Sequence, residues 1–73
     1  MRYNIIARQT NANTADGYST WEYVDEWEAE DAETALDQWM DDMRYNDNRF
    51  VQTSDNSYRL DDREYDVKAE AET

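Results

Sequence analysis

The chain has 73 residues, enough for one domain. It contains no cysteine and no histidine, which excludes disulfides, a Cys/His zinc site and nucleophilic catalysis by a Ser-His-Asp or Cys-His set. Nineteen acidic residues against seven basic ones give a net charge of −12, which opposes direct binding of nucleic acid or anionic lipid. Three tryptophans, six tyrosines and one phenylalanine nevertheless indicate a folded chain, because disordered acidic segments are poor in aromatic residues.

The first part of the chain predicts a β-hairpin. Residues 2–10 are expected to form a strand around a pair of isoleucines. Residues 11–17, which end at the only glycine, have the composition of a turn or loop. Residues 18–27 alternate with a period of two, which is typical of a second, half-buried strand.

A helix is expected at about residues 31–45. Asp31 is a good N-cap residue, and Arg44 lies in the last turn, where the helix dipole favours a positive charge. The apolar residues follow the i, i+3, i+4, i+7 spacing of an amphipathic helix: Ala32, Ala35, Leu36, Trp39, Met40 and Met43. One face of this helix should therefore cover a sheet.

The remainder of the chain predicts two or three further strands, at 49–53, 58–61 and, as an option, 64–69. Residues 54–57 provide turn chemistry between the first two, and residues 70–73 are expected to be frayed. The predicted fold class is α+β: an antiparallel sheet of four to five strands in β-β-α-β-β order, with one helix packed on one face. Residues 1–73 are expected to form a single domain.

Aromatic side chains are expected to supply most of the core, because so short a chain buries only about 60% of its unfolded surface. The rings assigned to the core are Trp21, Tyr23, Trp27 and Trp39. A further set is expected to be exposed and could anchor a partner: Tyr18, Tyr45 and Tyr58.

The acidic residues are concentrated in one region. No lysine or arginine lies between Gln9 and Met43, whereas the rest of the chain is nearly balanced. On the expected helix, Glu33, Asp37 and Asp41 recur every four residues, about 6 Å apart at 1.5 Å per residue. Like charges at this spacing destabilise an isolated helix by a few tenths of a kcal/mol per pair, and no lysine lies nearby in the sequence to offset this cost.

Double-stranded DNA carries one negative charge per about 1.7 Å of axis. Rows of carboxylates could therefore occupy a protein groove that is built for phosphates. The sequence predicts a non-enzymatic inhibitor that binds the basic nucleic-acid site of a larger protein, as a monomer or a homodimer. The expected partner-binding residues are Glu22, Glu26, Glu28, Glu30, Glu33, Asp37 and Asp41.

Other functions find less support in the residues. Nineteen acids will always place some pair at a catalytic separation, so carboxylate pairs are not specific for an enzyme. Asp41-Asp42 and Asp61-Asp62 lack the glycine and the ligand spacing of a calcium loop, and no cofactor or dedicated metal site is expected. Two alternatives stay open: an interaction module that uses exposed aromatic residues, and a halophilic or phage accessory protein whose acidity serves solubility.

Short, cysteine-free and strongly acidic chains of this kind resemble the phage-encoded inhibitors of host defence, including anti-CRISPR and anti-restriction proteins that mimic DNA. Residues 27–36 resemble the strand-to-helix junction of small phage α+β proteins. The resemblance implies a CRISPR effector or another nuclease complex as the target, bound at its basic channel. It carries no individual residue across. With no signal peptide or membrane span expected, the predicted location is the cytoplasm, that of the host for a phage protein.

Overall fold

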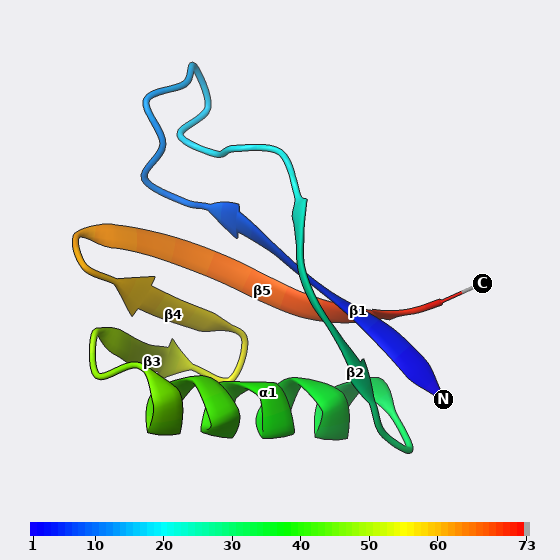
Figure 1. The fold of residues 1–73 in the computed structure, drawn as a ribbon. Helices are drawn as coiled ribbons and strands as arrows, with labels where there is room; N and C mark the ends of the chain where they lie inside the picture. The colour runs from blue at the N-terminus through cyan, green and yellow to red at the C-terminus, as the bar shows by residue number, and fades with distance from the viewer. Residues whose placement is uncertain (73) are drawn as a thin grey trace.

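A computed structural model describes residues 1–72. Five antiparallel strands form one sheet, and a single helix packs on one of its faces (Figure 1). The α+β class and the element order are confirmed, and the optional last strand is present. The elements are β1 (Arg2–Gln9), β2 (Glu22–Glu28), α1 (Ala32–Asn46), β3 (Phe50–Ser54), β4 (Ser57–Leu60) and β5 (Arg63–Ala71).

The strand order across the sheet is β2-β1-β5-β4-β3. The last strand therefore lies at the centre, where it pairs with β1 on one side and β4 on the other. The two ends of the chain lie side by side through this pairing, in which Ala7 is opposite Val67 and Ile5 is opposite Ala69. Glu70 and Ala71, expected to be frayed, are held in β5 for this reason, whereas Thr73 lies outside the described residues.

The helix forms where the sequence predicts it, shifted by one residue. Asp31 is the N-cap, and its carboxylate accepts a hydrogen bond from the Thr34 amide at 2.7 Å. At the other end the Asp47 amide donates to the Met43 carbonyl at 2.9 Å. The residues buried against the sheet are Ala35, Trp39 and Met40, while Ala32 in the first turn stays exposed.

The core lies between α1 and the sheet, and Trp39 is at its centre with 1% of its surface exposed. Its ring meets Phe50 and Tyr58 edge-on, with centroids 5.7 and 5.6 Å away. Tyr58 also stacks on Phe50 at 4.6 Å and on Tyr65 at 4.9 Å. These contacts extend the core across β3, β4 and β5, and burial raises the pKa of Tyr58 to about 12.

The predicted aromatic core is only partly correct. Trp39 is buried, but Trp21 and Tyr23 are exposed, and Trp27 is half-buried with its indole N–H donating to Gln38 at 2.9 Å. Conversely Tyr58, expected at the surface, is only 6% exposed because its side of β4 faces Trp39.

A β-bulge explains the misplaced rings of β2. Asp25 is opposite Ile5 and Tyr23 is opposite Ile6. β2 therefore has one extra residue, Val24, between two pairs that are adjacent on β1. A bulge reverses the side on which the following residues point. Trp27 therefore shares the helix side with Tyr3, whereas Tyr23 lies with Ile6 on the side of the sheet that α1 does not cover.

The strand expected at 18–27 also begins later than predicted. Residues 10–21 form a loop that projects beyond the sheet on the side away from α1 (Figure 1). Its own hydrogen bonds hold it: the Ala12 amide donates to the Gly17 carbonyl at 3.1 Å, and the Ser19 amide donates to the Gln9 carbonyl at 2.9 Å. Gly17 has a φ of 82°, a left-handed conformation that glycine adopts without strain.

Candidate functional site

The outward face of α1 carries the predicted row of carboxylates. Glu33, Asp37 and Asp41 are all exposed, since the opposite side of the helix is buried against the sheet. Glu30 is also exposed and lies just before the helix. Four of the seven predicted binding residues therefore lie on or next to one solvent-facing helix surface.

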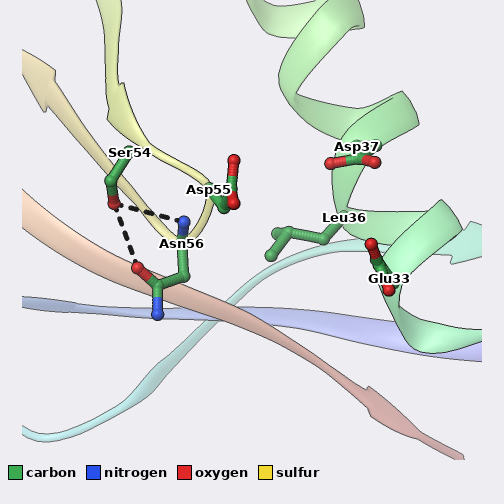
Figure 2. Close-up of a pocket in the computed structure, with 6 residues that line it drawn as sticks. All are labelled: Glu33, Leu36, Asp37, Ser54, Asp55 and Asn56. Atoms are coloured by element: carbon green, nitrogen blue, oxygen red, sulfur yellow. Dashed lines mark hydrogen bonds between the residues drawn. The ribbon is translucent and has the colours of Figure 1, made fainter.

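A hollow of about 530 Å³ lies beside this surface (Figure 2). Glu33, Leu36 and Asp37 line it from α1, and the turn between β3 and β4 lines it from the opposite side. That turn is held by Ser54, whose hydroxyl donates to the Asn56 side-chain oxygen at 3.0 Å. Asp55 at the tip of the turn faces Asp37 across the hollow, and so extends the acidic surface beyond the helix.

Asp55 was not among the predicted site residues. The sequence indicates the turn that contains it, but the turn's position beside α1 depends on how β3 follows the helix in the fold. Glu33, Asp37 and Asp55 are here named the hollow carboxylates. Within residues 1–72 none of the three forms an ion pair.

Two of the predicted residues are engaged within the chain. Asp41 forms an ion pair with Arg44, which also donates to the Gln52 side chain. Glu26 forms an ion pair with Arg2. Such exposed pairs contribute only about 0–1 kcal/mol, but they reduce the negative potential that these two carboxylates present to a partner.

The strand residues do not continue the helix row. Glu26 and Glu28 lie opposite Asn4 and Arg2, on the side of the sheet away from α1. Glu22 is opposite Ala7, whose side chain points toward the helix side. The seven predicted residues thus divide into a helix set and a strand set on different parts of the molecule.

The uncovered side of the sheet holds a cluster that the sequence did not reveal. The Arg8 guanidinium lies over the rings of Tyr18 and Trp21, 4.2 and 4.9 Å from their centroids. The Lys68 ammonium also lies over the Trp21 ring, 4.5 Å from its centroid. Arg8 also donates to Asp66 at 3.3 Å. The loop that carries Tyr18 and Trp21 is therefore fastened to β1 and β5 by cation–π contacts.

One carboxylate on this side has a perturbed pKa. Partial loss of solvent and the neighbouring Glu26 carboxyl raise the pKa of Glu72 above its usual value. The backbone brings the two acids together, because the Glu72 amide donates to the Arg2 carbonyl at 3.1 Å and Arg2 pairs with Glu26. Two carboxyls thus share the neighbourhood of a single arginine.

Within the described part of the chain, no group of three or more acidic residues is arranged to hold a metal ion. No described helix is long and apolar enough to cross a membrane. Comparison of the chain with protein-family models, with curated proteins and with solved structures finds no match.

Proposed function

We propose that the protein is a non-enzymatic inhibitor that binds the basic nucleic-acid site of a larger protein through the acidic surface around α1. The observation that carries this proposal is the set of hollow carboxylates: three exposed acids without an ion-pair partner within residues 1–72, grouped on two adjacent elements. Carboxylates in this state keep their full charge available for lysine and arginine of a partner.

The position of this surface supports contact with a large groove. α1 lies along one side of a thin molecule, whose dimensions are 36 × 29 × 16 Å. Glu33 and Asp37 are exposed on the side of this helix that borders the β3–β4 turn. A basic cleft can therefore receive the helix without any rearrangement of the core.

The net charge of −12 supports the same proposal because it would raise the rate of association with a basic partner. Opposite charges on two proteins accelerate their encounter, and the acceleration falls as ionic strength rises. An inhibitor that competes with nucleic acid needs such an advantage, because its competitor is itself strongly charged. The resemblance to phage-encoded inhibitors points to a CRISPR effector or another nuclease complex as the class of target.

The experiment compares two variants of equal net charge. In the first, Asp37→Lys changes one of the hollow carboxylates; in the control, Asp62→Lys changes an acid in the turn between β4 and β5. Asp62 is also exposed and free of ion pairs within residues 1–72, and it lies outside both α1 and the uncovered side of the sheet. Each immobilised protein is exposed to host-cell lysate and eluted with a salt gradient, with duplex DNA or RNA as competitor.

The proposal expects a nucleic-acid-binding complex that salt and nucleic acid both displace. Retention should be lost in the helix variant and kept in the control variant, since only the first changes the hollow carboxylates. Equal loss in both variants would show that net charge alone matters, and the assignment of the surface would fail. A retained partner that neither salt nor nucleic acid displaces would instead favour binding through exposed aromatic residues.

A further inference from the structure

The side of the sheet opposite α1 is uncovered, and we name it the open face. It consists of the outward side chains of all five strands, and the loop at residues 10–21 contributes Tyr18 and Trp21 at one end. An antiparallel sheet tolerates water on one side. The open face nevertheless differs from an ordinary wet face in both its apolar content and its charge.

Its apolar content is high for a surface. Tyr23 is 64% exposed, and Trp21 beside it is 36% exposed. Ile6 lies opposite Tyr23 on the neighbouring strand, and Val51 is exposed at the far edge of the same face. With Tyr18, which is 42% exposed, the open face carries three large exposed aromatic rings in a domain that needs apolar burial for its stability.

Its charge is close to balanced, in contrast to the rest of the molecule. Four of the seven cations lie on it: Arg2, Arg8, Arg59 and Lys68. Six of the nineteen acids accompany them: Glu26, Glu28, Glu64, Asp66, Glu70 and Glu72. The open face thus has a net charge of −2, and the remainder of the chain has the other −10 of the total of −12.

From this distribution we infer that the open face is the contact surface for a second copy of this chain. Cations and acids alternate across its strands, as in Arg8 opposite Asp66 and Arg59 opposite Glu64. A surface with both signs can meet a copy of itself about a two-fold axis with unlike charges in contact. No other occupant is so well matched, because a strongly basic or acidic partner would leave half of these charges opposed.

The dimensions of the molecule and the position of its acidic surface are compatible with this contact. The broad side of the molecule measures 36 by 29 Å, whereas a standard interface buries about 800 Å² per partner. In a face-to-face dimer the two α1 helices lie on the outside, so the strongly acidic surfaces are as far apart as possible. Salt screens the repulsion between two chains of net charge −12, whereas charge pairs enclosed in the contact are screened much less, so the dimer should become tighter as salt rises.

The salt dependence separates this inference from the proposed function. Binding of a basic partner through the hollow carboxylates should weaken with salt, whereas self-association should strengthen. Self-association is also measured on the protein alone, with no partner present. Either idea can therefore fail without the other, and the dimer would present two acidic helices on opposite sides.

Sedimentation equilibrium of the full chain tests the inference, at about 0.05 and 0.5 M salt. The variant is Tyr23→Glu, which places a charge beside Trp21 on β2, at one edge of the open face. The matched control is Tyr45→Glu, because Tyr45 is a 91% exposed tyrosine on α1 and the substitution is chemically identical. Val51→Lys provides a second test at the other end of the open face, and circular dichroism establishes that each variant is folded.

The expected result is a wild-type dimer that tightens with salt and that Tyr45→Glu leaves unchanged. Tyr23→Glu and Val51→Lys should each weaken the dimer, the first by roughly tenfold or more because it replaces the most exposed aromatic ring of the open face. A wild-type monomer at every concentration and both salt levels would overturn the inference. So would folded open-face variants that associate as tightly as the Tyr45→Glu control.

Discussion

The two faces of this sheet are built from the same strands, yet one is buried beneath a helix and the other is exposed. On the side of α1, alternate residues of β1 and β5 such as Ile5 and Val67 are buried in one cluster with Trp39. On the open face, their sequence neighbours form ion pairs and cation–π contacts, as Arg8 does with Asp66 and Trp21. A single helix can cover only one side, so the other side depends on cross-strand pairs of opposite charge.

The same comparison explains how the chain tolerates its charge. Most of the cations lie on the sheet, where they can pair across strands, and α1 retains only Arg44. The carboxylates of the helix point into solvent, where water screens their mutual repulsion. No charged or polar residue is buried among the described residues, so the core itself experiences little of the net charge.

The largest expected effect distinguishes two tryptophans on opposite faces. Trp39→Ala should destabilise the fold by about 3–5 kcal/mol, because it removes a buried ring from the centre of the core. Trp21→Ala should cost clearly less, since this ring is 36% exposed and its cation–π contacts with Arg8 and Lys68 lie at the surface. Thermal and urea denaturation followed by circular dichroism measure both values.

A third variant at the same position sharpens this contrast. The Trp39 indole N–H is buried and has no hydrogen-bond partner within the described residues. Trp39→Phe removes this unsatisfied donor together with part of the ring, so it should cost clearly less than Trp39→Ala. Equal losses for Trp21→Ala and Trp39→Ala would contradict the assignment of the core to the helix side alone.

The next effect concerns the start of α1. Asp31→Ala removes the acceptor of the Thr34 amide and should lower the melting temperature at pH 7 by on the order of 5 °C. Asp31→Asn keeps an acceptor oxygen and should retain most of the stability. Melting temperatures of the three proteins measured in parallel give the comparison.

The pH dependence of this cap has a definite sign. The hydrogen bond from Thr34 lowers the pKa of Asp31 below its ordinary value of 3.8. The contribution to stability is therefore complete above about pH 3.8 and is lost as the pH falls through the lower value of the folded state. The difference between wild type and Asp31→Ala should narrow below pH 3.8, and a difference that stays constant down to pH 2 would show that the carboxylate is not the cap.

Much of the fold could be predicted from local sequence patterns. The apolar spacing of the helix, its Asp31 cap and the alternation of the later strands each depend on neighbouring residues, and all are confirmed. The exposure of Trp21 and Tyr23 could not be predicted, because a period of two gives no sign of the bulge at Val24. The bulge appears only when β2 is aligned with β1.

The candidate site shows the same limit. Exposure of Glu33, Asp37 and Asp41 follows from helix periodicity and is confirmed. The addition of Asp55 depends on the packing of the β3–β4 turn beside α1, and the separation of Glu26 and Glu28 from the helix set depends on strand pairing. Residues brought together by tertiary contacts leave no periodic signal in the chain. Their role as a binding surface remains a prediction.

A smaller effect tests whether the helix row is costly to the fold. Asp37→Lys places a cation between Glu33 and Asp41, at i, i+4 spacing from each. Two repulsive pairs become attractive, and α1 should gain about 0.2–0.5 kcal/mol per pair. Urea denaturation should show this gain at low salt and little of it at high salt. Lys68→Asp on the open face should have the opposite sign, since Lys68 contacts Trp21 and lies 3.8 Å from Glu70.

The smallest effect concerns Glu72 at the margin of the open face. Its raised pKa, caused by partial loss of solvent and by Glu26, means that the folded state holds this proton more tightly than the unfolded chain does. Ionisation of Glu72 therefore weakens the fold as the pH rises from about 4.5, the ordinary pKa of this carboxyl.

Glu72→Gln should slightly raise the melting temperature at pH 7 and leave it unchanged at pH 3, where the wild-type carboxyl is already neutral. Glu70→Gln is the matched control, since it removes the partner of Lys68 and should give no gain. A gain from Glu72→Gln that persists at pH 3 would show that the effect comes from the amide itself and not from ionisation of the carboxyl.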